Sequence, residues 1–279
     1  MKYSKTYTDY IVSTAKKLIS IPSPTGYTKN ATEFIYQELS SLCYSPVITN
    51  RGNLICDLGG EGKPIILAGH IDTLGGMVRS VKPNGRLRMT RVGGLALGSA
   101  EAENCTIFTR DGHIYSGTLQ MNEPSSHVAG TKLSEEKRTE ETMEIVIDEL
   151  THSAKSTKAL GIDTGDFIAF DPRFTEVPSG CIKSRFLDDK AGSSVLIALA
   201  RYISENRLSL SRKTYLLFPC HEEVGTGAAS GLPDAEEFIS VDMGCVGGDL
   251  SCDETMVSIC VKDGGGPYDY GIVSRMIEV

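Results

Sequence analysis

The chain has 279 residues, enough to bury one large hydrophobic core or two smaller ones. Its hydrophobic share of 40% and charged share of 23% are ordinary for a soluble globular protein. The formal net charge of -8 without a Lys/Arg block argues against a nucleic-acid partner, and no apolar run is long enough to span a membrane.

Cysteine usage and the N-terminus bear on the cellular compartment. The eight Cys residues are scattered without a Cys-x-x-Cys pair, and several lie in apolar runs, which favours buried free thiols over a disulfide framework. The residues after Met1 contain no apolar signal core. These features predict a protein of the reducing cytoplasm.

The first sixty residues read as two helices followed by a hairpin. A helix is predicted from Asp9 to Ser20, capped by Thr8 or Asp9, because its apolar residues share one face and two prolines follow. A second amphipathic helix is predicted from about Asn30 to Leu42. Two short apolar runs around a turn, within 46–58, predict a β-hairpin.

Three strand-like runs each end in a His or carboxylate residue. These are 64–69 with His70 and Asp72, 214–219 with Glu222 and Glu223, and 238–241 with Asp242. Ligands of an open α/β sheet bind at the carboxyl ends of its strands, so these side chains are expected at one edge. Adjacent carboxylates are costly unless a cation lies beside them, although a Glu-Glu pair on an exposed turn is also common. His and carboxylate ligands together indicate zinc or a similar divalent ion.

The character of the chain changes after Gly76. From about Met77 to Gly180 the segments are short, alternating and rich in turns, and Asp111-Gly112 is a strong hairpin signal. The charge-rich stretch from Ser134 to Glu141 reads as a solvated loop. This region is predicted to be a small β-rich domain inserted into an α/β domain.

The α/β pattern resumes at Cys181. Two carboxylates, Asp188 and Asp189, directly precede a helix predicted from Ala191 to Glu205. The inward face of that helix is expected to carry Val195, Leu196, Leu199 and Ile203. A last strand is predicted from Met256 to Val261.

The histidines differ in how well they suit metal binding. In His-x-Asp at an extended strand end, His70 and Asp72 lie on the same side, so Asp72 can accept the ring N–H that faces away from a metal. A hydrogen-bonded core histidine is the alternative. His113, His127 and His152 have no ligand-type neighbours and are interpreted as surface or structural residues.

The turn from Gly225 to Gly231 offers a different function. It follows a strand and is expected to open a helix, as a dinucleotide-binding turn does, and Asp242 ends the next strand. However, Ser230 occupies the place of the third Gly or Ala, and the two preceding glutamates would repel a pyrophosphate. A nucleotide-dependent oxidoreductase is therefore the less favoured alternative.

Four separated motifs occur in the order and spacing of a known family. They are Gly69-His70-Ile71-Asp72-Thr73-Leu74-Gly75, Phe186-Leu187-Asp188-Asp189-Lys190-Ala191-Gly192, Glu222-Glu223-Val224-Gly225 and Val241-Asp242-Met243-Gly244. On these residues the chain resembles the glutamyl/deblocking aminopeptidase family, which contains the tetrahedral (TET) aminopeptidases. The resemblance covers nearly the whole chain.

The resemblance implies a metal-dependent aminopeptidase with two divalent ions, zinc or cobalt. His70 and Asp242 would hold one ion and Glu223 the other, with Asp188 bridging them. Glu222 would be the general base, and Asp72 would orient His70.

The resemblance also implies the architecture. The fold would be α/β, with a mixed sheet flanked by helices in a phosphorylase/hydrolase-like dinuclear aminopeptidase domain made of residues 1–76 and 181–279. Residues 77–180 would form an inserted β-barrel-like domain for homo-oligomerisation, as in a hollow dodecamer that admits peptide substrates.

One departure from the family pattern concerns the second ion. Family members supply a final His ligand in a later segment, whereas no His follows His221 here. The expectation is a catalytic domain that lacks its C-terminal segment, a weakened second metal site and impaired peptidase activity. The alternative is a catalytically inactive fragment or assembly subunit of the same family.

Overall fold

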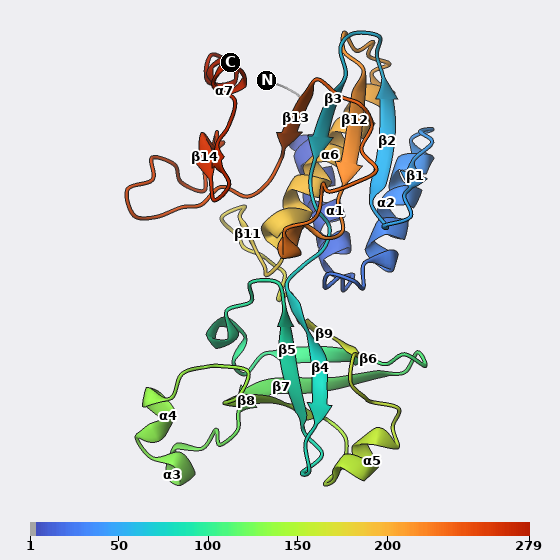
Figure 1. Cartoon of the computed structure of the whole chain (residues 1–279). Coiled ribbons are helices and arrows are strands. Elements are labelled where there is room, and N and C mark those ends of the chain that lie inside the picture. The colour runs from blue at the N-terminus through green and yellow to red at the C-terminus, as the bar shows by residue number, and fades with distance from the viewer. Residues whose placement is uncertain (1–3) are drawn as a thin grey trace. The chain divides into compact units, whose positions relative to one another are not determined.

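A five-stranded mixed sheet organises the first part of the computed structural model, which describes residues 4–279 (Figure 1). Its strand order is β1 (Val47–Ile48), β2 (Leu54–Gly59), β12 (Thr214–Phe218), β3 (Ile65–Ala68) and β13 (Glu237–Ser240). Strands β1, β2 and β12 pair antiparallel, whereas β12, β3 and β13 run parallel to one another. The carboxyl ends of the three parallel strands therefore meet at one edge of the sheet.

Three long helices pack on one face of this sheet. They are α1 (Ser4–Ile19), α2 (Lys29–Ser41) and α6 (Leu187–Glu205). Their apolar side chains share a core cluster with β2 and β12, in which Leu18, Ile35 and Phe218 are fully buried. Alternate residues of the strands face the other way, where a smaller cluster surrounds Leu217. The predicted mixed sheet flanked by helices is confirmed.

A closed six-stranded barrel lies between β3 and α6 in the chain (Figure 1). Its strands, in barrel order, are β4 (Gly75–Val81), β5 (Leu87–Val92), β8 (Met143–Ile147), β7 (Ile114–Met121), β6 (Asn104–Phe108) and β9 (Phe167–Phe170). Their inward side chains form a second core cluster, in which Leu87, Ile107 and Leu119 are fully buried. Strands β6 and β7 pair antiparallel around Asp111-Gly112, so the predicted hairpin is confirmed.

Short helical turns connect the barrel strands. They are η1 (Leu97–Ala100), α3 (Ser126–Ala129), α4 (Lys132–Glu135) and α5 (Ala154–Lys158). The stretch from Ser134 to Glu141 was expected to be a loop, and it is one except that α4 ends inside it.

The two connections between sheet and barrel differ in length. Residues 69–74 alone join β3 to β4, and they include His70 and Asp72. The return path from β9 to α6 is longer and contains the antiparallel pair β10 (Thr175–Glu176) and β11 (Ile182–Lys183). The entry segment is further held by hydrogen bonds between Ser23–Thr25 and Thr73.

Residues Asp242–Val279 form a second compact unit. It contains the antiparallel pair β14 (Lys262–Asp263) and β15 (Gly266–Pro267), and helix α7 (Tyr270–Ile277). Asp269 caps α7 by accepting the Ile272 N–H at 2.8 Å. The strand predicted from Met256 to Val261 is wrong. Residues 256–261 pair with no strand of this unit, and Val257 is 92% exposed. The apolar side chains of this segment are therefore not packed against a sheet.

Two details of the predicted helices are also wrong. Helix α1 already begins at Ser4, so Thr8 and Asp9 lie inside it and do not cap it. In α6, Val195 is 42% exposed, whereas Leu196 and Ile203 are buried. A helix turns by about 100° per residue, so Val195, which directly precedes the buried Leu196, points away from the narrow inward face of α6.

Neither disulfides nor membrane helices are found in the described part of the chain. All eight Cys residues have free thiols, as predicted, but only Cys56, Cys105 and Cys220 are buried. Within residues 4–279 no helix combines the length and the apolar character needed to cross a membrane.

Candidate metal centre

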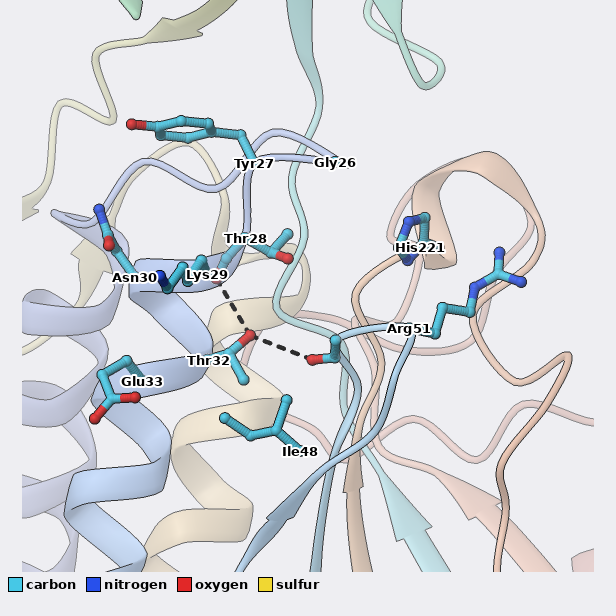
Figure 2. Close-up of a pocket in the computed structure, with 11 residues that line it drawn as sticks. Gly26, Tyr27, Thr28, Lys29, Asn30, Thr32, Glu33, Ile48, Arg51 and His221 are labelled. Carbon is cyan, nitrogen blue, oxygen red and sulfur yellow. Dashed lines mark hydrogen bonds between the residues drawn. The ribbon is translucent and has the colours of Figure 1, made fainter. Parts of the chain in front are cut away.

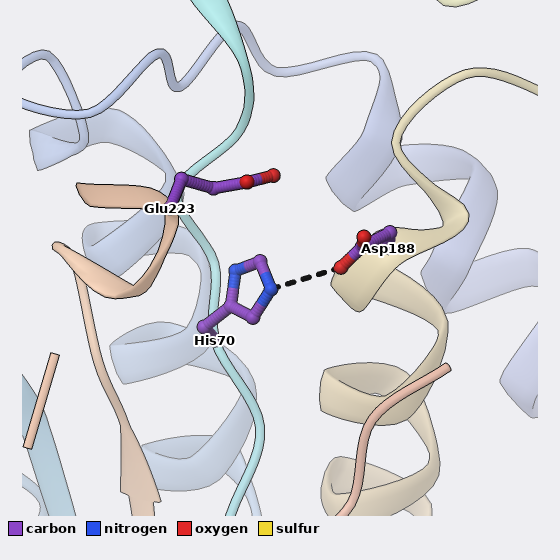
Figure 3. A group of neighbouring side chains, drawn as sticks. All are labelled: His70, Asp188 and Glu223. Carbon is purple, nitrogen blue, oxygen red and sulfur yellow. Dashed lines mark hydrogen bonds and ion pairs between the residues drawn. The ribbon is translucent and has the colours of Figure 1, made fainter. Parts of the chain in front are cut away.

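Three side chains from distant parts of the sequence converge beside the sheet edge (Figure 3). His70 follows β3, Asp188 lies at the start of α6, and Glu223 belongs to the turn η2 (Glu222–Val224) that follows β12. One possible ligand atom of each lies within 4.8 Å of those of the other two. The His70 Nε2 atom is 3.0 Å from Asp188 Oδ1. The sequence-predicted convergence of these three residues is thus present.

The His70 ring has a defined orientation. Its side chain is only 2% exposed, and its Nδ1–H donates to the backbone carbonyl of Asp72 at 2.9 Å. The Asp72 carboxylate lies farther away, with Oδ1 at 3.5 Å from Nδ1. The ring is therefore held mainly by the Asp72 backbone oxygen rather than by the carboxylate expected from sequence. Nε2 is left facing Asp188.

The Asp72 carboxylate has a second task, which sequence reasoning missed. It is fully buried and accepts hydrogen bonds from the Thr25 hydroxyl at 2.7 Å and from the backbone N–H groups of Glu222 and Glu223 at 3.1 and 3.2 Å. Burial favours the neutral acid, but the hydrogen bonds from His70, Thr25 and Glu222 outweigh it and hold the Asp72 pKa below its usual range. An ionised Asp72 thus fixes the turn that carries both glutamates.

The charges around the cluster suit a cation. Burial and then the neighbouring Asp188 carboxylate raise the pKa of Glu223 to about 7. Burial alone would lower the pKa of His70, but its hydrogen bonds to Asp188 and Asp72 raise that pKa to about 11. The cluster thus attracts positive charge strongly. One imidazole nitrogen and two carboxylates are the ligand types of zinc and related divalent ions, so the donor set fits such a metal.

The remaining predicted site residues lie in different places. Glu222 is adjacent to the cluster, with Oε2 at 3.7 Å from His70 Nε2, and its side chain is 50% exposed. Asp242 is the first residue of the second unit, so its role as a ligand stays a prediction. The exposed His113 pairs with Asp111 on the barrel hairpin, in agreement with its interpretation as a surface residue.

The sequence predicted no role for Asp189, the second carboxylate of the pair ahead of α6. The Asp188–Asp189 peptide bond is cis. Asp189 is only 1% exposed, and its Oδ2 accepts the backbone N–H of His70 at 3.0 Å. The sequence signal was the pair of carboxylates itself, which did not predict the contact of Asp189 with His70.

A pocket of about 670 Å³ opens next to the glutamate turn (Figure 2). It is lined by the segment before α2, the first turns of α2, the β1–β2 hairpin and His221. His221 directly precedes Glu222, and its buried Nδ1 atom has no hydrogen-bond partner among the described residues. His221 is not in the group of possible ligands formed by His70, Asp188 and Glu223.

The dinucleotide-type turn lacks the element that such a site needs. No helix follows Gly225–Gly231 before β13, so the turn presents no helix N-terminus to a pyrophosphate. The carboxylates of Glu222 and Glu223 directly precede it. Nothing in this part of the structure supports the oxidoreductase alternative.

Comparisons with known proteins found a matching family model and several similar relatives. The family model for M42 glutamyl aminopeptidases matches residues 52–279. The Bacillus subtilis protein named "Putative aminopeptidase YhfE" is 40% identical over 267 residues, which cover 95% of this chain and 77% of that relative. The lysyl aminopeptidase of Pyrococcus furiosus is 25% identical over 82% of this chain, and only 65% of its own length is covered. The solved TET1 peptidase of Pyrococcus horikoshii superimposes with a TM-score of 0.80 at 22% identity, covering 96% of this chain and 80% of that one, which shows a common fold.

Proposed function

Because this chain belongs to the M42 glutamyl aminopeptidase family, we propose that it is an aminopeptidase that depends on two divalent metal ions held around His70. Family membership makes the chain a peptidase-type hydrolase. We further propose that the two ions are zinc or cobalt. The observation that carries it is the convergence of His70, Asp188 and Glu223 within 4.8 Å.

Each side chain has a distinct role in this proposal. His70 and Asp242 would hold one ion, Glu223 would hold the other, and Asp188 would be shared between them. When bound, such ions activate a water molecule and polarise the peptide carbonyl. Asp72 keeps the Nε2 atom of His70 directed at Asp188 and holds the glutamate turn in place.

Glu222 is the proposed general base. Its carboxylate lies beside the cluster but is half exposed, so it can meet both the reacting water and solvent. There it would accept a proton from the water and later donate it to the leaving amine.

The proposal is tested by replacing His70 in the full chain. His70→Ala should lower both the bound metal, measured by mass spectrometry, and the turnover of aminoacyl anilides. His113→Ala is the matched control, because that histidine is exposed on the barrel and should change neither. Unchanged metal content in His70→Ala would contradict the site. Bound metal with no turnover of any peptide or anilide by the unsubstituted chain would favour the inactive assembly subunit.

The substrates are proposed to be peptides with a free N-terminus. The family is named for glutamyl substrates, whereas the P. furiosus relative is named a lysyl aminopeptidase. The names of the relatives therefore differ in the N-terminal residue that is removed. Turnover of a series of Glu-, Lys- and Leu-anilides would measure which N-terminal residue this chain prefers.

We assign assembly to the barrel and catalysis to the rest of the chain. Residues 77–180 would be the oligomerisation domain, and residues 1–76 and 181–279 the catalytic domain. The closed barrel with its own core supports this division. The P. horikoshii TET1 peptidase is described as assembling into a tetrahedron or a large octahedral shell, which supports a homo-oligomer, dodecameric in the predicted form. A monomer in sedimentation velocity would contradict it.

A further inference from the structure

The hydrogen bonds at the end of β3 reveal how the metal centre is aligned. The N–H groups of Gly69 and Ile71 donate to the carbonyls of Leu217 and Pro219, on the β12 side. Along a strand, alternate N–H groups point to opposite sides, so the His70 N–H points away from β12 and towards the β13 side. Strand β13 ends at Ser240, level with Ala68, and gives His70 no partner.

Asp189 takes the place of the missing strand partner. Its Oδ2 accepts the His70 N–H at 3.0 Å, and its Oδ1 accepts the Gly192 N–H at 3.1 Å within α6. One turn later, the Ser193 hydroxyl lies 3.0 Å from the carbonyl oxygen of Gly69 and 2.9 Å from that of His70, both of which can accept its hydrogen bond. The start of α6 therefore contacts both the N–H and the carbonyl group of His70.

Two glycines make this close approach possible. A Cβ on Gly69 would lie 3.0 Å from Asp189 Oδ2 and 3.1 Å from the Ser193 nitrogen. A Cβ on Gly192 would collide with the Asp189 carboxylate and lie 2.6 Å from the Val241 carbonyl oxygen. A side chain at Gly69 would therefore crowd the start of α6, and one at Gly192 would crowd the Asp189 carboxylate and the Val241 carbonyl.

The position of Asp188 depends on these contacts. Asp188 and Asp189 have non-helical backbone angles, so the regular hydrogen bonds of α6 do not fix them. On the other flank, Lys190 donates to the carbonyls of Leu18 and Ile21 at 3.0 and 2.6 Å. Asp188 is thus placed by the neighbours that follow it in the chain.

We propose that Asp189 and Ser193 are positioning residues that set the separation of His70 and Asp188, an inference that rests on the proposed metal centre. Neither residue supplies a metal ligand. Both act through the backbone of His70, and both are buried. Contacts of this indirect kind typically change metal affinity by about 10–100-fold when they are removed.

The test compares two adjacent serines in the full chain. Ser193→Ala removes the hydroxyl that contacts Gly69 and His70. Ser194→Ala removes an equally buried hydroxyl that bonds only the Lys190 carbonyl of its own helix, at 2.7 Å. Asp189→Asn is the second variant, because its amide group would set an N–H against the N–H of His70 or Gly192. The probe is Co²⁺ added to metal-free protein and followed by its visible absorption, with thermal unfolding of the metal-free proteins recorded in parallel.

We expect Ser193→Ala and Asp189→Asn to bind Co²⁺ about 10–100-fold more weakly than the unsubstituted chain and to change the shape of its spectrum. Ser194→Ala should match the unsubstituted chain in both. If Ser193→Ala folds and binds Co²⁺ with unchanged affinity and spectrum, or if Ser194→Ala weakens binding equally, the positioning role is wrong although the metal centre stands. If the unsubstituted chain itself binds no Co²⁺, the proposed metal centre fails, and this inference fails with it. Should Asp189→Asn not fold, the serine pair still decides.

Discussion

The carboxylate of Asp72 accepts the backbone N–H of Glu222 at 3.1 Å, although 150 residues separate them. The backbone carbonyl of the same aspartate accepts the ring N–H of His70. A single residue therefore connects the proposed metal ligand with the proposed general base. The alignment of the two depends on Asp72 remaining ionised and buried.

The first prediction concerns this connection. Asp72→Asn keeps the backbone carbonyl that binds His70 but sets an amide N–H against the N–H of Glu222 or Glu223. We therefore expect a fall in kcat of about 10–100-fold with a smaller change in metal content. Steady-state kinetics on an aminoacyl anilide, with metal measured by mass spectrometry, check this. Full loss of metal would mean that the carboxylate also holds the His70 ring.

The second prediction separates the two adjacent glutamates. Glu222→Gln should keep the metal and lose about 10²–10⁴-fold in turnover, because a proton acceptor is removed while the ligands remain. Glu223→Gln should lose metal, because Glu223 is one of the proposed ligands. Metal content and turnover of both variants decide, and the opposite pattern would exchange the two roles.

The third prediction concerns the stability of the metal-free protein. Burial and Asp188 raise the pKa of Glu223 from 4.5 to about 7, so the folded state binds more protons than the unfolded state between these values. The contribution of Glu223 to the free energy of unfolding must then fall as pH rises from about 4.5 to about 7. Glu223→Gln should remove this fall. Urea unfolding of metal-free protein at several pH values measures it, and identical pH profiles for the two proteins would refute the shift.

The fourth prediction uses the fully buried Lys190. Burial lowers its pKa from 10.5 to about 7, so between these values the unfolded state binds more protons than the folded state. The contribution of Lys190 to the free energy of unfolding therefore rises with pH from about 7 to about 10.5. Relative to Lys190→Met, the unsubstituted chain should gain stability across that window. The free energy of unfolding of both proteins is measured at several pH values. If the difference between them does not change with pH, the Lys190 amine keeps its ordinary pKa.

Most of the fold could be predicted from local patterns. The hairpin of β1 and β2, helix α2, the barrel strands β5 to β9 and the turn at Asp111-Gly112 follow from apolar periodicity and turn residues, which act over a few positions. The strand expected from Met256 to Val261 could not be judged in this way. Its residues suit a strand, but pairing requires a neighbour, which the surrounding sequence does not supply.

The candidate site was predictable only in part. His70 and Glu223 were found because strand ends with ligand-type residues meet at one edge, and Asp188 was found from the carboxylate pair ahead of a predicted helix and from the family resemblance. The contacts of Thr25 with Asp72 and of Asp189 with His70 were not, because they join residues 47 and 119 positions apart. Hydrogen bonds of that range leave no periodic trace in a single sequence.

The six residues between β3 and β4 have a consequence for protein engineering. They carry His70 and Asp72 and lead directly into the first barrel strand. A chimera that receives a foreign barrel must therefore be spliced after this hexapeptide, at Gly75 or later. Its other splice point lies in the longer stretch between Phe170 and Leu187, ahead of the start of α6, where Arg173 and Arg185 pair with Glu103 of the barrel region. A change of length on the entry side would therefore displace His70 and Asp72 directly.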